Sequence, residues 1–182
     1  MKTRRIVTGH SPAGRAVVIS DGFSPWAVDA LHIPLLRTEL LWQTADPPSL
    51  PSASTADPAI GARSFLPKAG ATSIQVVNFP PDASAMPADA TPTELGADYA
   101  KAFPGLAERF ERENPGMHVT DTVDYCILLE GELVMELDDG ATTVVRAHDI
   151  VIQNGTRHGW RNRSGASARM LFVMIGATRP FG

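Results

Sequence analysis

Short runs of alternating or continuously apolar residues dominate the C-terminal third of the chain. They predict strands at 117–120, 123–129, 132–138, 142–147, 149–153, 157–162 and 168–176, separated by turns rich in glycine, asparagine and aspartate. Short strands at such close and even spacing are typical of an antiparallel sandwich or barrel. The pattern therefore predicts an all-β fold for this part of the chain.

The N-terminal part carries fewer such runs. Residues 4–20 contain two β-branched runs around Ser-Pro-Ala-Gly, which predicts a hairpin with His10 at its tip. Residues 35–43 fit either a short helix or a strand, and the proline-containing flanks favour a strand. Another strand is expected at 71–79, where it ends at a pair of prolines.

The remaining N-terminal segments predict connections and one helix. Residues 21–34, 44–70 and 83–92 have no clear period and are rich in proline, glycine, serine or alanine, which indicates irregular structure. Apolar residues then recur at helical spacing from Phe103 to Phe110, and Pro104 suits a first turn. We therefore expect a short amphipathic helix over 104–113 that packs on the sheet.

Composition and charge narrow the class of protein. A chain of 182 residues with 43% hydrophobic and 20% charged residues is long enough for one structural domain with a core. The net charge of -4 and the scattered Lys and Arg residues make nucleic acid an unexpected partner. No apolar run approaches the roughly 18 residues that a membrane helix needs, so we expect no membrane contact and a cytoplasmic location. The single cysteine, Cys126, lies in an apolar strand pattern and is not expected to be catalytic.

Two predicted strands carry histidines that suit a metal site. Residues two apart in a strand share a face, so His118, Asp124 and His158 converge if the interior of a barrel holds their faces. Two imidazoles and a carboxylate are ligands that a divalent Fe, Zn, Ni or Mn ion accepts, with positions left open for water or substrate. The alternative is that both histidines are ordinary strand residues bonded to backbone and that Asp124 caps a turn.

The segment from Gly116 to Gly176 resembles the cupin superfamily in both of its sequence motifs. The positions that keep the family's spacing are His118, Thr120, Asp124 and Gly131 in the first motif, and Gly155, His158 and Asn162 in the second. Thr120 replaces the second histidine of the family pattern, Asp124 replaces its glutamate, and Gln153 stands where a proline is usual.

The resemblance implies a cupin-type antiparallel β-barrel, also called a double-stranded β-helix or jelly roll. Residues 116–182 would form the cupin core, and residues 1–115 would supply a β extension, loops and a short helix that complete a single structural domain. Members with one barrel commonly pair through such extensions, so the resemblance also implies a homodimer.

For function, the resemblance implies a divalent-metal-dependent enzyme acting on a small organic molecule, aromatic or carboxylated, most plausibly as an oxygenase. The metal would be held by His118, Asp124 and His158. The residues expected to line the substrate pocket or to support the ligands are Thr120, Gln153, Trp160, Met135 and Phe172. The alternatives are a metal-free isomerase or lyase in which a histidine acts as acid and base, and a non-catalytic small-molecule-binding cupin.

Overall fold

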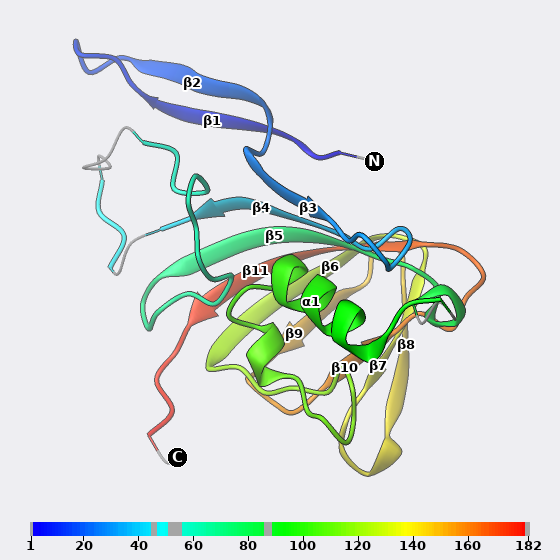
Figure 1. Cartoon of the computed structure of the whole chain (residues 1–182). Coiled ribbons are helices and arrows are strands. Elements are labelled where there is room, and N and C mark those ends of the chain that lie inside the picture. The colour runs from blue at the N-terminus through cyan, green and yellow to red at the C-terminus, as the bar shows by residue number, and fades with distance from the viewer. Residues whose placement is uncertain (1, 45–46, 51–55, 86–88, 181–182) are drawn as a thin grey trace.

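The computed structural model describes residues 2–44, 47–50, 56–85 and 89–180 (Figure 1). The strands in these ranges are β1 (Arg4–His10), β2 (Ala16–Phe23), β3 (Trp26–Asp29), β4 (Arg37–Gln43), β5 (Thr72–Phe79), β6 (Thr122–Glu130), β7 (Glu132–Glu136), β8 (Thr142–Arg146), β9 (Ile150–Gln153), β10 (Gly159–Arg161) and β11 (Ala168–Gly176). The helical elements are α1 (Pro92–Ala102) and the 3-10 turns η1 (Asp82–Ser84), η2 (Ala107–Arg109) and η3 (Asp138–Gly140).

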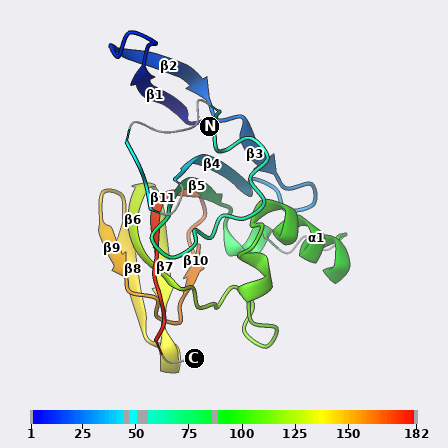
Figure 2. The same ribbon diagram turned by 90° about the vertical axis from the view of Figure 1, so that its left-hand side faces the viewer.

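The strands form three antiparallel sheets. A six-stranded sheet has the order β3-β4-β5-β11-β6-β9, and a three-stranded sheet has the order β10-β7-β8. The hairpin of β1 and β2 forms a separate two-stranded sheet that projects from the body (Figures 1 and 2). The predicted mostly-β antiparallel fold with one short helix is therefore confirmed, as is the N-terminal hairpin.

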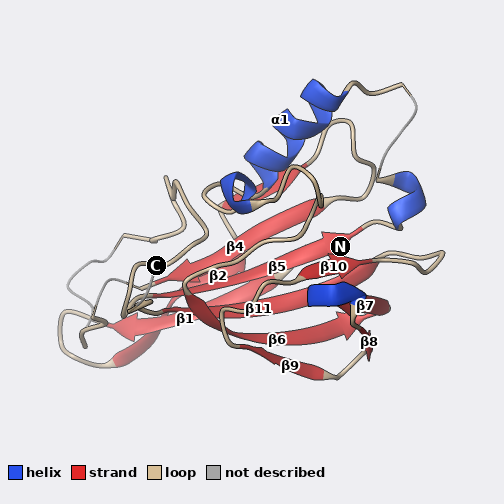
Figure 3. Cartoon of the chain, turned by 90° about the horizontal axis from the view of Figure 1, so that it is seen from below, coloured by secondary structure: helices blue, strands red, loops and turns tan. Residues whose placement is uncertain are grey.

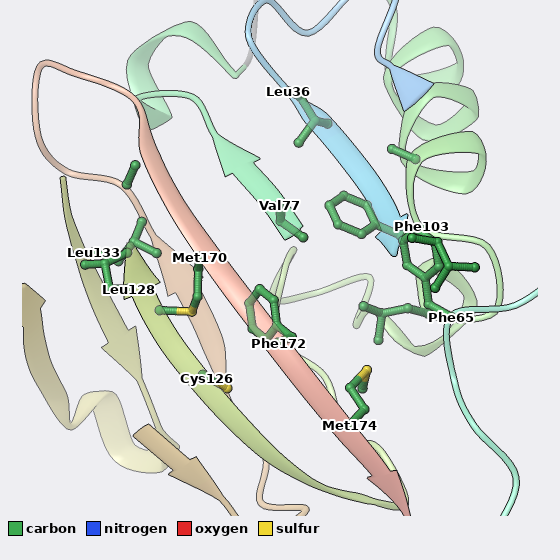
Figure 4. Close-up of a cluster of buried hydrophobic side chains, with 14 of the residues drawn as sticks. Leu36, Phe65, Val77, Phe103, Cys126, Leu128, Leu133, Met170, Phe172 and Met174 are labelled. Atoms are coloured by element: carbon green, nitrogen blue, oxygen red, sulfur yellow. The ribbon is translucent and has the colours of Figure 1, made fainter. Parts of the chain in front are cut away.

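The core lies between the two larger sheets and extends beneath α1. Along β6, Thr122, Asp124, Cys126 and Leu128 are buried while Tyr125 between them is exposed. This period of two is the signature of a strand with one face in the interior. Met170 and Phe172 on β11 pack into the same cluster, together with Leu133 of β7 (Figure 4). The alternation places the Asp124 carboxyl inside the molecule rather than on its surface.

The helix prediction is wrong in position. The α-helix spans Pro92–Ala102, and the predicted range 104–113 holds only the 3-10 turn η2. Thr91 and Glu94 form a capping box around Pro92, which starts the helix in a segment that was expected to be loop until residue 92. Pro104 disfavours helical backbone at Phe103, so the helix ends just before the segment in which it was expected.

Two strand predictions are also corrected. Residues 21–34 were expected to be irregular, but β3 forms within them and pairs with β4. Residues 117–120 were expected to form a strand, but they contribute only an isolated bridge between His118 and His158. The described parts of 44–70 contain no helix or strand, as expected, whereas residues 45–46 and 51–55 lie outside the described residues.

The N-terminal and C-terminal parts of the chain contribute strands to the same sheet. β5, from the N-terminal part, pairs along its length with β11, from the C-terminal part, so that strands of both parts share one sheet. Figure 3 shows α1 on one side of this sheet, with β7, β8 and β10 at the right of the view. The division at residue 115 stays a prediction. In the part of the chain that the structure covers, no helix combines the length and apolar character needed to cross a bilayer.

Candidate functional site

A cavity of about 590 Å³ opens between the six-stranded sheet, β10 and α1. Of the predicted site residues, His118, Asp124, His158, Trp160 and Phe172 line this cavity. Thr120, Gln153 and Met135 are not among the residues that line it. The large apolar lining residues of α1 and the segment that follows it are Tyr99, Phe103, Leu106 and Phe110, which cover the cavity opposite the strands.

His118 and His158 form a pair of neighbouring rings. Their backbones exchange two hydrogen bonds, with N to O distances of 2.9 and 3.0 Å, and their ring centroids are 4.4 Å apart. His118 Nδ1 lies 3.0 Å from the carbonyl oxygen of Gly116, and His158 Nδ1 lies 3.0 Å from that of Thr156. Because a carbonyl oxygen only accepts, each Nδ1 carries the proton, and each Nε2 of the neutral rings keeps its lone pair.

Both imidazoles are held neutral at ordinary pH. Burial lowers the pKa of His118, partly opposed by the Gly116 carbonyl. Burial is the main cause that lowers the pKa of His158, to about 4, and repulsion between the two rings when both are protonated lowers it further. The pair therefore presents two hydrogen-bond acceptors.

Asp124 is the third titratable group on the cavity. It is 3% exposed, and its Oδ1 has no hydrogen-bond partner among the described residues. Burial raises the pKa of its carboxyl to about 6, and a hydrogen bond from Thr122 opposes this shift. Asp124 therefore exchanges a proton near neutral pH, which is the range in which general acids and bases are most effective.

The three predicted residues outside the cavity are held by other contacts. Thr120 is 2% exposed, and its hydroxyl lies 2.9 Å from that of Thr122, which in turn supports Asp124. Gln153 is opposite Asp124 in the β6–β9 ladder, accepts a hydrogen bond from the Thr156 hydroxyl, and has its Nε2 3.9 Å from the sulfur of Met135. The supporting role predicted for them stays a prediction.

The side chains do not gather as a three-donor metal site. In the described ranges, no three His, Cys, Asp or Glu side chains come together in an arrangement that could hold a metal ion. The two Nε2 atoms are suitable donors, but the aspartate is one methylene shorter than the glutamate of the cupin pattern, and Thr120 offers a neutral hydroxyl in place of a third imidazole. The ligand role of His118, Asp124 and His158 stays a prediction.

Aromatic rings surround the histidine pair. Phe110 meets His118 edge to face at 5.3 Å between centroids, and Trp160 meets His158 at 6.0 Å. Trp160 also contacts Phe172 of β11 at 6.2 Å. The cavity therefore has mainly apolar walls with a small number of polar atoms, which is typical of small-molecule sites.

Ion pairs fix the rim of the cavity. Arg157 binds both carboxylate oxygens of Glu111 at 2.6 and 2.7 Å, and this contact lowers the pKa of Glu111. Arg161 donates to Glu136 at 2.7 Å and to the carbonyl oxygen of Pro115 at 2.7 Å. These contacts tie the segment after α1 to β10 and its neighbours.

Sequence reasoning missed the contribution of the N-terminal part to the cavity. Tyr99 and Phe103 lie on or next to the helix that was placed too late in the chain, and Gln75 lies on β5. The Thr-Pro-Thr-Glu sequence at 91–94 is a capping-box signal that would have located α1 and its aromatic residues. No local signal singles out Gln75, because a polar residue in a strand usually faces solvent.

Comparisons with known proteins find fungal relatives over part of the chain. "Phomopsin biosynthesis cluster protein C'" of Diaporthe leptostromiformis is 42% identical over 62 residues, which are 34% of this chain and 33% of that protein. "Cupin-domain-containing oxidoreductase fogC" of Aspergillus ruber is 30% identical over 109 residues, 47% of this chain and 51% of that protein. Two further distant relatives are also described as cupin-domain-containing oxidoreductases. The chain spans between about a third and a half of the length of these relatives.

No family model matches the chain. Among solved structures, a Cupin 2 conserved barrel domain protein from Salinispora arenicola aligns over 82% of both chains with 15% identity and a TM-score of 0.41. That superposition is loose, so the fold assignment rests on the antiparallel strand order and on the sequence relatives.

Proposed function

We propose that the chain is a cupin-type enzyme that binds a small organic molecule in its cavity and moves a proton within it. The reaction class is isomerisation or elimination next to a carbonyl, with no metal ion required. Asp124 transfers the proton, while His118 and His158 position the substrate.

The observation that carries this proposal is the state of the buried Asp124 carboxyl. It has a free oxygen on an apolar cavity, and burial raises its pKa to about 6. In a buried carboxyl that only stabilises the fold, both oxygens usually form hydrogen bonds within the protein. A buried group with a shifted pKa in a cleft is a candidate for catalysis.

The proton transfer needs no oxidant, reductant or other co-reactant. The Asp124 carboxylate takes a proton from a carbon next to the substrate carbonyl, and the electron pair of that C–H bond moves through the new C=C bond onto the carbonyl oxygen, which gives an enolate. The protonated Asp124 then returns the proton to a different atom of the substrate, or the intermediate expels a leaving group. The Nε2 atoms of the histidines accept hydrogen bonds from substrate hydroxyls and hold the reacting carbon in place.

The test is solvent deuterium incorporation into small ketones. We would incubate the protein in D2O with a panel of neutral aromatic and aliphatic ketones and follow loss of the α-proton signal by NMR. Asp124→Asn keeps the shape of the side chain but removes the base, and should lower the exchange rate by about 100-fold or more. Asp139→Asn, at an exposed turn, is the matched control. Exchange at the uncatalysed rate across the panel, or equal rates for the wild type and Asp124→Asn, would reject the proposal.

A second candidate function is oxidation of the bound molecule. It is favoured by the description of three relatives as cupin-domain-containing oxidoreductases. The two Nε2 atoms would then hold a divalent metal ion, which would supply the redox chemistry. This candidate predicts that the protein consumes oxygen with an organic substrate only after Fe(II) is added, and that His158→Asn abolishes both Fe(II) binding and oxygen uptake. Oxygen uptake that persists in the metal-free protein would contradict it.

A further inference from the structure

We infer that the cavity takes an aromatic molecule without a negative charge that carries both a hydrogen-bond acceptor, which Trp160 Nε1 recognises, and a hydroxyl group. This inference names the ligand class for the site of the proposed function and rests on that function for the assignment of the cavity as a substrate site. Charge, ring contacts and unpaired polar atoms of the lining residues support it independently of one another.

The charges on the cavity disfavour an anionic ligand. Four carboxyl side chains belong to the lining residues, which are Asp82, Glu108, Glu111 and Asp124. Arg161 is the one lysine or arginine among the lining residues that the structure describes. Its guanidinium is already bound to Glu136 and to the carbonyl oxygen of Pro115, both at 2.7 Å. A carboxylate or phosphate would lose its hydration there without gaining a free cation.

The rings on the cavity suit a flat ligand. On one side, the contacts continue from Phe110 through His118, His158 and Trp160 to Phe172, with centroid distances between 4.4 and 6.2 Å. On the helix side, Tyr99 and Phe103 stack at 6.1 Å with an interplanar angle of 20°. Figure 4 shows Phe172 on β11 and Phe103 beside α1. Rings in offset-stacked or edge-to-face contact attract one another beyond the effect of the area that they bury, which favours an aromatic ligand here.

Three polar atoms of lining residues lack partners among the described residues. They are Trp160 Nε1, Gln75 Oε1 and Asp124 Oδ1, and all are buried. Most buried polar atoms in folded proteins are hydrogen-bonded, so three such atoms on one cavity mark positions where a ligand supplies the partner. The indole N–H only donates, which calls for an oxygen acceptor on the ligand.

The other two unpaired atoms define a donor on the ligand. Gln75 is 3% exposed, and its Nε2 is directed to the sulfur of Met174 at 3.1 Å, which leaves Oε1 as the free acceptor. Asp124 Oδ1 is an acceptor when the carboxyl is ionised. A hydroxyl group on the ligand therefore satisfies one of these two atoms, while a carbonyl or ether oxygen satisfies Trp160. An aromatic ring with a carbonyl and a hydroxyl substituent therefore supplies both the acceptor for Trp160 and a donor for one of these two oxygens.

The test compares three matched probes by isothermal titration calorimetry at pH 7.5. They are 4-hydroxyacetophenone, which is neutral and aromatic, 4-hydroxybenzoate, which is anionic, and 4-acetylcyclohexanol, which is the saturated neutral analogue. We expect 4-hydroxyacetophenone to bind at least tenfold more tightly than each of the other two. Trp160→Phe should weaken its binding about tenfold, because the ring stays and only the N–H donor is lost. Trp42→Phe, outside the cavity lining, is the matched control.

The outcomes separate this inference from the proposed function. Binding of 4-hydroxybenzoate or 4-acetylcyclohexanol as tight as that of 4-hydroxyacetophenone would overturn the inference, as would equal effects of Trp160→Phe and Trp42→Phe or no binding of any probe below 10 mM. If the binding order holds but no ketone exchanges deuterium, the proposed function fails and the ligand class stands. If exchange occurs but the anion binds best, the ligand class fails and the proposed function stands.

Discussion

Replacing Asp124 by asparagine should stabilise the fold in a pH-dependent way. Burial raises the pKa of Asp124 from 3.8 to about 6. The unfolded chain therefore ionises this carboxyl at a lower pH than the folded protein does, so folding carries a penalty that grows as the pH rises from about 4 to about 6. At about 1.36 kcal/mol per pKa unit, the penalty is about 3 kcal/mol at pH 8 and about 1 kcal/mol at pH 4.5.

Urea unfolding followed by tryptophan fluorescence measures this penalty. The unfolding free energy of Asp124→Asn should rise by about 2 kcal/mol relative to that of the wild type between pH 4.5 and pH 8. Comparing the two pH values removes any constant cost of the new amide group. The exposed Asp139→Asn variant should show no such change. A difference that is the same at both pH values would refute the claim that the folded protein holds this carboxyl in a desolvated site.

Four further predictions concern the core, the helix, the histidine pair and the hairpin. Leu128→Ala should cost about 2–5 kcal/mol of unfolding free energy because Leu128 is fully buried. Ile150→Ala, at a 65% exposed position, should cost less than ~1 kcal/mol, and equal losses in urea titrations would contradict the assigned core. Thr91→Ala removes the capping box and should cost about 0.5–2 kcal/mol, which an unchanged urea midpoint would disprove. Burial lowers the pKa of His158 to about 4, so at pH 5 the unfolded chain binds a proton on this residue that the folded protein does not. The unfolding free energy of the wild type should therefore fall by about 2 kcal/mol relative to that of His158→Asn between pH 7.5 and pH 5, and a constant difference would count against this. We propose that two copies of the chain associate through the exposed apolar residues of the hairpin, such as Phe23 at 60% exposure. Light scattering should then give twice the chain mass for the wild type and the mass of one chain for Phe23→Glu, and a monomeric wild type would contradict the proposal.

The strands were predictable where one face is buried along several residues. Buried and less buried positions alternate from Thr122 to Leu129 in β6 and from Met170 to Gly176 in β11, and the apolar runs of both strands are visible in the sequence. β3 has only four residues, and its pairing with β4 depends on backbone contacts that leave no pattern in so short a segment. The same limit applies to 117–120, whose apolar and polar alternation could not show that only His118 would find a bridging partner.

The candidate site was predictable in part for a similar reason. Motif spacing identified His118, Asp124 and His158, and all three line one cavity. It could not show how the shorter aspartate is oriented, because that depends on the hydrogen bond from Thr122 and on packing across the sheet. The aromatic half of the cavity comes from α1 and the segment after it, which are distant in sequence and were displaced by the incorrect helix boundary.

The most direct test of the central claim measures deuterium exchange against metal content. Protein would be purified without added metal, assayed by elemental analysis, and divided into a chelator-treated sample and samples loaded with Fe(II), Zn(II), Ni(II) or Mn(II). We expect the exchange rate per protein molecule to be the same in all samples and to fall only in Asp124→Asn. A rate that vanishes after chelation and rises in proportion to bound metal would contradict it.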